Sequence, residues 1–370
     1  MKRLLCIVSF MNTGGAETFL MKLYRELDKN HYQMDFCICN LEKNFYEDEI
    51  QKMGGRIYHL PPKTKHPFLF LYQFCKLPHL SDYNYVLRLG SSIFETGDLY
   101  LCWLFGIKIR IFRSCNANAL YPNIMIKIHK LLRKFIMCIV NVKIAPSKLA
   151  AQFTFGNIKN VHILPNGLDT KAFAFNENSR NKIRKELNTE GKFVVGHIGR
   201  FNLQKNHKFL LQIFAEIKKK NKNAELWLIG KGELENEIKE QAKNLNILDN
   251  VKLLGIRTDI PELLSGMDIF IFPSLFEGMP NTVIEAQTNG LPCLISDTIT
   301  SQARQTNLVN FMSLQDTPSN WAEKSLQIAD NQTQENRPKA AIQMRKAGYD
   351  IKNVIKQFTT LVFGEKNASN

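Results

Sequence analysis

Short apolar runs rich in β-branched and aromatic residues alternate with helical patterns through almost the whole chain, and this rhythm constrains the fold more than any other feature. Runs that are apolar throughout indicate strands buried on both faces, as in parallel sheets covered by helices. The pattern therefore predicts an α/β protein with two doubly wound, Rossmann-like domains. The predicted strands are 4–10, 34–39, 56–60, 85–89, 107–112, 142–145 and 161–164 in the first half, and 193–198, 225–229, 251–254, 269–272 and 292–296 in the second.

A turn followed by a polar stretch divides the two halves. The turn is Pro165-Asn166-Gly167-Leu168-Asp169, and the stretch 176–181 lacks apolar periodicity. We therefore expect one domain over 1–170 and a second over 171–345, with 346–370 as a helical C-terminal segment.

The overall charge favours an anionic partner without identifying it. The 49 Lys and Arg residues outnumber the 34 Asp and Glu residues, which gives a formal charge of +15. Such a charge suits a phosphate-rich ligand, an acidic membrane surface or nucleic acid. Because no DNA- or RNA-binding motif accompanies the charge, nucleic acid is not expected as a partner.

The first residues and the cysteines indicate a cytoplasmic protein. The start, MKRLLCIVSFM, has the basic and apolar parts of a signal peptide, but an acidic amphipathic helix follows it without a small-residue cleavage site. We expect this segment to form the first buried strand. No apolar stretch approaches the roughly 18 residues that span a bilayer. The eight cysteines form no CxxC pair, which is typical of reduced thiols in the cytosol.

The segment PSLFEGMPNTVIEA, residues 273–286, carries the most chemical information. It follows an apolar strand, and 282–287 has the pattern of the first turns of a helix. The loop before that helix would offer backbone N–H groups to a diphosphate. Glu277 and Glu285 would lie near the carboxyl end of the strand, where open α/β sheets bind ligands. By itself, a pair of carboxylates at this spacing is more often a helix cap and a solvated side chain.

Other glycine turns follow predicted strands. Gly199 and Arg200 end one strand, and Lys205 opens the next helix, so two cations could meet one diphosphate. Gly230-Lys231-Gly232 follows another strand but lacks the third glycine of a dinucleotide fingerprint. Gly255 with Ile256, and Gly14 with Gly15, are further turns of this kind. Each of them alone is more often a plain tight turn.

Taken together, these motifs resemble those of the family 4 retaining glycosyltransferases, which have the GT-B fold of two Rossmann-like domains facing a cleft. The segment 273–286, with Asn289 to Pro292 after it, is similar to the family's EGxPxxxxEA block over its full width. The resemblance implies an acceptor-side first domain, a donor-binding second domain, and a C-terminal helix that crosses back to the first. Residues Gly199-Arg200 with Lys205 resemble the family's GR…K block, and 14–17 resembles its GGAE block.

The resemblance also implies a role for each motif. Arg200 and Lys205 would stabilise the leaving diphosphate, Glu277 would contact the transferred sugar, and Glu285 would hold the donor ribose. The remaining donor-site positions implied are Gly14, Gly15, Gly199, Gly230, Gly255, Ile256, Gly278, Met279, Pro280 and Asn281.

The chain departs from the family pattern in the first domain. Relatives of the exopolysaccharide branch tend to carry His-Ser-His-Asn where this chain has Arg113-Ser114-Cys115-Asn116. No acceptor-side histidine is therefore carried over. We expect His162 and His197 to be core residues. Because there is no Asp-x-Asp motif and no His or Cys ligand cluster, neither a metal nor another cofactor is expected.

The reaction implied by the resemblance is transfer of a hexose from a nucleoside diphosphate sugar, with UDP as the expected nucleotide, to a glycan acceptor. The family expectation is retention at the anomeric carbon, a lipid-linked acceptor and a place in surface polysaccharide synthesis. Two alternatives remain open. One is a non-hydrolysing UDP-sugar epimerase, and the other is a non-catalytic subunit that binds a nucleotide sugar.

Residues 123–139 have the pattern of a basic amphipathic helix. The apolar residues Ile124, Met125, Ile128, Leu131, Leu132, Phe135, Ile136 and Ile139 share one face, and Lys127, Lys130, Arg133 and Lys134 gather on the other. This arrangement predicts attachment to an anionic membrane surface, on the inner face of the cell membrane. The alternative is a helix whose apolar face packs into the core of the first domain.

Overall fold

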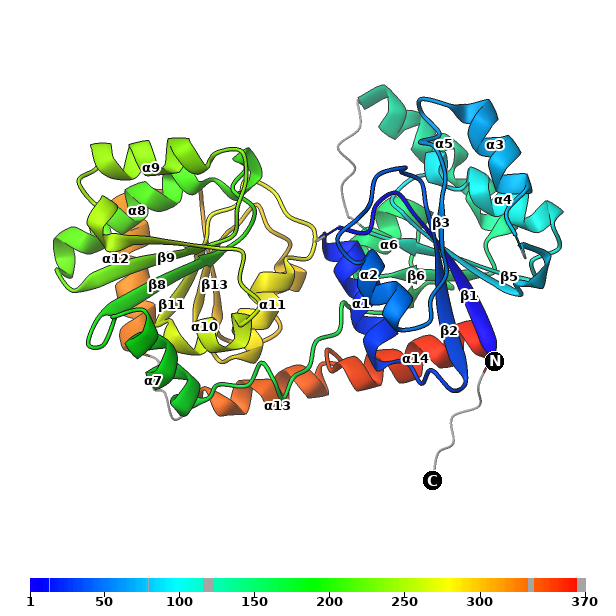
Figure 1. Ribbon diagram of the computed structural model, residues 1–370. Helices are drawn as coiled ribbons and strands as arrows, with labels where there is room; N and C mark the ends of the chain where they lie inside the picture. Colours follow the sequence, from blue (N-terminus) through cyan, green and yellow to red (C-terminus); the bar gives the residue numbers. More distant parts are fainter. Residues whose placement is uncertain (13, 79, 116–122, 332–335, 365–370) are drawn as a thin grey trace. The chain divides into compact units, whose positions relative to one another are not determined.

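The computed structural model describes residues 1–12, 14–78, 80–115, 123–331 and 336–364 of the chain. The chain folds into two compact units (Figure 1). The first unit comprises Met1–Gly167 and the segment from Asp350 onward, and the second comprises Leu168–Tyr349. Thr13, which precedes the motif 14–17, and Asn116, the last residue of the segment Arg113-Ser114-Cys115-Asn116, lie outside the described residues.

The first unit contains a parallel sheet with strand order β3-β2-β1-β4-β5-β6-β7. Its strands are β1 (Lys2–Val8), β2 (Tyr32–Ile38), β3 (Ile57–His59), β4 (Tyr85–Gly90), β5 (Ile109–Ser114), β6 (Val142–Ala145) and β7 (His162–Ile163). The helices of this unit are α1 (Gly15–Glu26), α2 (Glu47–Lys52), α3 (Pro67–Cys75), α4 (Gly97–Leu104), α5 (Asn123–Ile139), α6 (Lys148–Phe155) and α14 (Ile351–Phe363).

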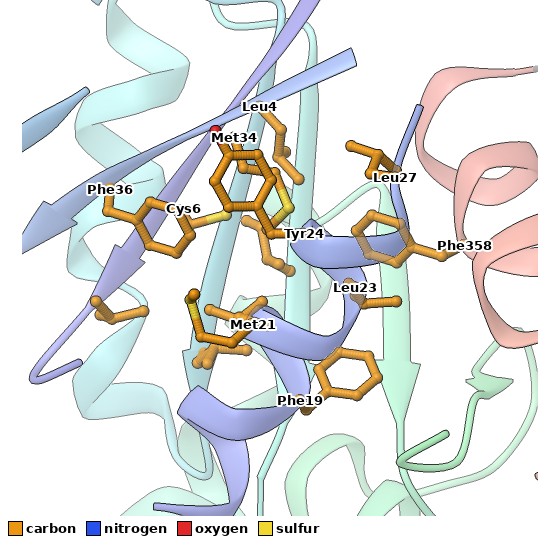
Figure 2. Packing of buried hydrophobic residues seen from close by; sticks show 14 of the residues in the cluster. Leu4, Cys6, Phe19, Met21, Leu23, Tyr24, Leu27, Met34, Phe36 and Phe358 are labelled. Carbon is orange, nitrogen blue, oxygen red and sulfur yellow. The ribbon is translucent and has the colours of Figure 1, made fainter. Parts of the chain in front are cut away.

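The C-terminal helix α14 belongs to the core of the first unit. Figure 2 shows Phe358 of α14 facing the apolar side of α1, which carries Phe19 and Leu23. Asp350 caps the start of α14 by accepting a hydrogen bond from the Lys352 N–H group, and Gly364 ends the helix in the left-handed conformation. Both are common signals for helix ends. The chain therefore returns to its first unit after completing the second.

The second unit contains a parallel sheet with strand order β10-β9-β8-β11-β12-β13. Its strands are β8 (Phe193–Ile198), β9 (Ala224–Ile229), β10 (Val251–Gly255), β11 (Ile269–Phe272), β12 (Cys293–Ser296) and β13 (Val309–Met312). Its helices are α7 (Glu177–Glu186), α8 (His207–Lys220), α9 (Glu235–Asn244), α10 (Ile260–Gly266), α11 (Asn281–Thr288), α12 (Pro318–Asp330) and α13 (Pro338–Lys346).

Two apolar clusters cover the two faces of the second sheet. Strand β9 is buried along its whole length, and its alternate residues point to opposite clusters. Trp227 packs in one cluster with Phe270, while Leu226 and Leu228 pack in the other with Trp321. A strand buried on both faces has no polar side, which explains why the sequence of β9 is almost uninterrupted in its apolar character.

The structure corrects the sequence interpretation at two places. Strand β13 was not predicted, because Val309–Met312 is short, half-buried and at the edge of its sheet. His162 was expected in the core, but it lies exposed on β7, the two-residue edge strand of the first sheet. His197 is fully buried on β8, as expected. Among the described residues, no helix combines the length and the apolar character needed to cross a bilayer.

Candidate active site

The strongest candidate site lies at the carboxyl ends of β8 and β11. These neighbouring strands mark the point where the strand order of the second sheet reverses. From β8 the chain first adds β9 and β10 on one side of it, and then adds β11, β12 and β13 on its other side. Such a switch point splits the connections to opposite faces and leaves a crevice at the carboxyl ends of the strands. The loop 199–206 follows β8, and the loop 273–280 follows β11.

Hydrogen bonds tie these two loops together. The Asn206 side chain donates to the Pro273 carbonyl at 3.1 Å, and the Gln204 side chain donates to the Phe276 carbonyl at 2.9 Å. The Leu275 N–H group in turn donates to the Gln204 carbonyl at 2.9 Å. Asn206 has a positive φ of 55°, which asparagine tolerates better than most residues. The two motifs that the sequence separates by about seventy residues are therefore one hydrogen-bonded surface.

Lys205 and Glu277 meet at the centre of this surface. The Lys205 ammonium donates to Glu277 Oε1 at 2.6 Å, and both side chains are largely buried, with 16% and 11% of their surface exposed. The ammonium also lies 4.6 Å from the centroid of the Phe272 ring. Gly199 makes room for this arrangement, because a Cβ atom there would lie 3.0 Å from Lys205 Cε. The site thus presents a cation and a carboxylate whose positions are fixed by packing.

A third loop closes the side of the site next to β9. Gly230 has a φ of +137°, and a Cβ atom on it would lie 2.0 Å from the Gly199 carbonyl oxygen. Gly232 is equally constrained, since its Cβ would lie 2.3 Å from the Phe201 carbonyl oxygen. Only glycine fits such close backbone contacts. The Gly230 N–H group donates to the Gly255 carbonyl at 2.8 Å, so the turn that contains Gly255 and the exposed Ile256 joins the same edge.

Arg200 does not point where Lys205 points. Its guanidinium donates to Glu233 Oε2 at 3.1 and 3.2 Å, and 71% of the Arg200 side chain is exposed. Glu233 belongs to the loop after Gly232 and was not predicted as a site residue. The structure therefore brings Lys205 together with Glu277, while Arg200 stays on the same loop as Lys205 but pairs with a different carboxylate. The sequence analysis also did not predict the hydrogen bonds by which Gln204 and Asn206 link the two loops, since nothing in the sequence singles these residues out.

Helix α11 begins directly after the loop that carries Glu277. Pro280 is the residue before its first turn, and the helix begins at Asn281, one residue before the predicted start at 282. Gly278 and Met279 are half-buried between Glu277 and Pro280. Glu285 lies on the partly exposed side of α11, whereas Val283, Ile284 and Ala286 are buried. The start of a helix carries partial positive charge, which suits an anionic ligand beside the Lys205–Glu277 pair.

The predicted glycines of the first unit lie at the start of α1. Gly14 is the N-cap residue of the helix and Gly15 its first residue. The Glu17 carboxylate folds back over Gly14, where a Cβ atom would lie 2.2 Å from Glu17 Oε2. Burial raises the pKa of Glu17. The close approach is thus to the end of a flexible side chain, and Gly14 has an extended backbone with a φ of −88°.

Arg113 and Ser114, the first residues of the segment that departs from the expected histidine pattern, are buried, and Cys115 is half-buried. Arg113, near the end of β5, has 1% of its surface exposed, and its guanidinium carbon lies 3.6 Å from the centroid of the Phe19 ring. It also donates to the Asn166 side chain. Burial lowers the pKa of Arg113 to about 10 and raises the pKa of the Cys115 thiol to about 11. A cation and a protonated thiol therefore stand where relatives tend to have histidines.

No three His, Cys, Asp or Glu side chains in the described part of the chain gather in a way that could hold a metal ion. The positive charges at the carboxyl ends of β8 and β11 come instead from Lys205, Arg200 and the start of α11.

Comparison with known proteins identifies close relatives. Residues 179–347 match the family model "Glycosyl transferases group 1". The putative glycosyltransferase EpsF of Bacillus subtilis is 34% identical over 331 residues, which cover 87% of this chain and 86% of that protein. The UDP-Gal:alpha-D-GlcNAc-diphosphoundecaprenol alpha-1,3-galactosyltransferase of Escherichia coli is 36% identical over 141 residues, or 37% of this chain and 36% of that protein.

The fold has solved counterparts. Alr3699/HepE of Anabaena, solved in complex with UDP-glucose, superimposes with a TM-score of 0.77 over 97% of this chain and 98% of that one. The two sequences are 16% identical, so the likeness concerns the fold.

Proposed function

Because the chain belongs to the group 1 glycosyl transferases and has the GT-B fold, we propose that it transfers a hexose from a UDP-sugar to a lipid-linked glycan, with retention and without a metal ion. The single observation that carries this proposal is the Lys205–Glu277 pair at the switch point of the second sheet. The donor class and acceptor class are supported by the name of the Escherichia coli relative, which includes both UDP-Gal and a diphosphoundecaprenol acceptor.

Charge at the donor diphosphate is the central chemical demand. The bond between the anomeric carbon and the diphosphate breaks, and negative charge grows on the departing UDP. Positioned cations and helix N-termini stabilise such charge without reorganising. Lys205 is held in place by Glu277 and Phe272, and α11 starts four residues after Glu277 along the chain. Arg200 would leave Glu233 and turn to the diphosphate, which is feasible because their pair is exposed.

The two carboxylates have different assignments. Glu285, on the accessible side of α11, would accept hydrogen bonds from ribose hydroxyls. Glu277 would orient the transferred sugar while remaining paired with Lys205. A carboxylate that is already ion-paired is a poor nucleophile, because the cation stabilises its negative charge. We therefore assign Glu277 to positioning, and retention to a front-face path. In that path the acceptor oxygen bonds to the anomeric carbon on the face that UDP leaves, and its proton passes to a phosphate oxygen of UDP.

Backbone groups complete the proposed donor site. The half-buried residues Gly278 and Met279, the buried Pro280 and the first residue of α11, Asn281, would line the diphosphate and the sugar. Gly199, Gly230, Gly255 and Ile256 would face the nucleotide from the neighbouring turns.

The test is a panel of UDP-sugars offered to the purified protein with a saccharide on undecaprenyl diphosphate. We expect UDP release that requires both substrates, with one preferred sugar, and a product whose anomeric coupling constant matches that of the donor. Exchange of a ring hydrogen with solvent without acceptor would instead establish an epimerase. Tight UDP binding with no turnover on any donor would establish a non-catalytic subunit.

A lipid-linked acceptor requires approach to a membrane, and α5 has the surface for it. Three residues of its apolar stripe are exposed, with 62% exposure for Ile124, 75% for Leu131 and 58% for Phe135, whereas Ile139 at the end of the helix is buried. The three exposed side chains support a surface role over the alternative in which the stripe fills the core. Lys127, Lys130 and Lys134 are exposed as well, and the helix has no acidic residue. The side chains of residues 136 and 137 lie outside what the structure describes.

Helices α3 and α4 extend this surface. Phe68 and Tyr72 of α3 and Trp103 of α4 are 86%, 57% and 55% exposed. Phe74 of α3 and Leu99 of α4 share one apolar cluster, and Tyr100 of α4 contacts the backbone of Phe135 in α5. Aromatic residues with a polar edge suit the boundary between lipid and water. We propose that α3, α4 and α5 lie on the anionic cytoplasmic leaflet and bring the acceptor within reach.

A further inference from the structure

Two buried histidines lie beneath the loop that carries Lys205. His197 stands on β8 two residues before Gly199, and His207 is the first residue of α8, two residues after Lys205. Their side chains have at most 2% of their surface exposed, and their ring centroids lie 4.8 Å apart. The pair therefore brackets the loop in sequence and supports it in space.

The hydrogen bonding of this pair is incomplete. His197 Nδ1 lies 2.9 Å from the Ile271 carbonyl oxygen, so Nδ1 carries the proton and Nε2 has a free lone pair. In the described part of the chain, no partner at hydrogen-bond distance satisfies His197 Nε2 or either ring nitrogen of His207, whose ring has only a weaker contact with the Asn202 backbone. A buried polar atom without a partner costs stability, and such atoms tend to mark functional sites. An apolar ring would fill the same space more cheaply.

The surrounding rings connect the pair to the Lys205 ammonium. His197 stacks on Phe272 with a centroid separation of 5.3 Å, and Lys205 Nζ lies 4.6 Å from the centroid of the same Phe272 ring. Phe201, which belongs to the Lys205 loop, contacts His207 edge-on at 4.9 Å. These rings form one floor under the cation. Neutral imidazoles carry lone pairs, which attract a nearby ammonium group.

We propose that His197 and His207 are positioning residues: their uncharged, electron-rich rings hold the Lys205 ammonium in place. Their unpartnered nitrogens lower the stability of the folded protein. This inference rests on the proposed role of Lys205 in donor cleavage. Burial and the Lys205 charge lower the pKa of His207 to about 4, and burial and the His207 ring lower that of His197. The charged groups that face the pair are Lys205 and, through it, Glu277. Both imidazoles are thus neutral at physiological pH.

The decisive variant is His207→Phe, which keeps a ring and removes both nitrogens. We expect a melting temperature equal to or above that of the native protein, because unpartnered nitrogens have been removed. We also expect kcat for UDP release to fall about tenfold, while the KM for the donor changes less than about twofold. In a Lys205→Met background, the same substitution should change kcat less than about twofold, because the histidine acts through the lysine.

His129→Phe is the matched control. His129 is a buried histidine of the first unit that accepts a hydrogen bond from the Ile93 N–H group and bonds the Phe153 carbonyl through its other nitrogen. Its replacement should lower the melting temperature and leave kcat unchanged. If His207→Phe behaves like this control, or if its loss of kcat persists in the Lys205→Met background, the pair is only structural and the proposal is overturned.

The pKa of His207 tests the influence of Lys205 on this ring without an activity assay. The ring signal of His207, followed by NMR in the full-length protein, should titrate at a higher pH in Lys205→Met than in the native chain, because a nearby positive charge has been removed. An unchanged pKa would overturn the proposed contact between Lys205 and His207. A raised pKa in a protein without transferase activity would instead leave this contact standing and reject the proposed function.

Discussion

The two units share the same winding of strands and helices but differ in what they expose. In the second unit, three loops at the carboxyl ends of the strands are tied together by hydrogen bonds, and Lys205 and Glu277 are largely buried there. In the first unit, the helices α3, α4 and α5 leave apolar side chains such as Phe68 and Leu131 mostly in solvent. We propose that the surface of the second unit binds a small charged ligand and that the surface of the first unit is a contact surface for a membrane.

This difference also explains which parts of the molecule the sequence reveals. A site for a small ligand needs particular residues at fixed spacing, such as the glycines at 230 and 232 that pass close to neighbouring carbonyls. A contact surface needs only apolar and basic side chains on one side. Its sequence therefore resembles that of an ordinary core helix, and only the structure tells them apart.

The contact surface should give the largest effect. Replacing Lys127, Lys130, Arg133 and Lys134 by Gln removes four charges that contribute about 1 kcal/mol each near an acidic leaflet, or a factor of roughly a thousand in partitioning. Co-sedimentation with vesicles containing acidic lipid at low salt measures this loss, which should shrink as salt rises. Replacing four lysines of the second unit, Lys222, Lys239, Lys243 and Lys252, by Gln is the matched control. If the α5 variant binds the vesicles as well as the native protein does, α5 has only a structural role.

Removing the buried cation of the second unit should come next. Lys205→Ala should lower kcat about a hundredfold with little change in the donor KM, because the lost contact strengthens as UDP departs. Arg200→Ala should also lower kcat strongly if its exposed guanidinium turns to the diphosphate. Steady-state UDP release measures both variants. A near-normal kcat in both would remove these cations from the mechanism.

Glu285→Ala should affect a different quantity. If Glu285 holds the ribose, the variant should weaken UDP binding about tenfold and leave kcat at saturating donor close to normal. Calorimetric titration with UDP measures the binding. Thr282→Ala, on the same helix, serves as the control. Unchanged UDP affinity in Glu285→Ala would reject the ribose contact.

Acid sensitivity should show the smallest effect. His207 has a pKa of about 4 in the folded chain against about 6.5 when unfolded. Between these values the unfolded chain binds a proton that the folded chain does not, so the free energy of unfolding falls as pH falls, by at most about 1.4 kcal/mol per pH unit. Denaturant unfolding of the second unit should therefore show a shallower pH dependence in His207→Phe. The same slope in both proteins would contradict the buried neutral state.

Most of the fold follows from the sequence because parallel strands buried on both faces are nearly continuous apolar runs. Strands such as Phe193–Ile198 and Ile269–Phe272 lie where the pattern places them. The edge strand Val309–Met312 was not predicted, because it is short and half-buried and lacks that signal. The edge strand His162–Ile163 lies within the predicted run 161–164, but its two side chains are exposed.

The candidate site could be predicted only in part. The glycine turns and the start of α11 follow from local patterns, and the family resemblance adds Lys205 and Glu277 as site residues. Their direct contact depends on how two distant loops pack, as does the pairing of Arg200 with Glu233. The histidine pair beneath Lys205 was invisible for the same reason. His197 has the local context of an ordinary core residue, and its incomplete hydrogen bonding appears only in three dimensions.

The most direct test of the account is donor turnover in excess EDTA, compared between the native protein and Lys205→Met. If protein cations stabilise the departing diphosphate, the native rate of UDP release should be unchanged by chelation, and the variant should be about a hundredfold slower with or without EDTA. Loss of native activity in EDTA, restored only by magnesium or manganese, together with a near-normal rate for Lys205→Met, would contradict it.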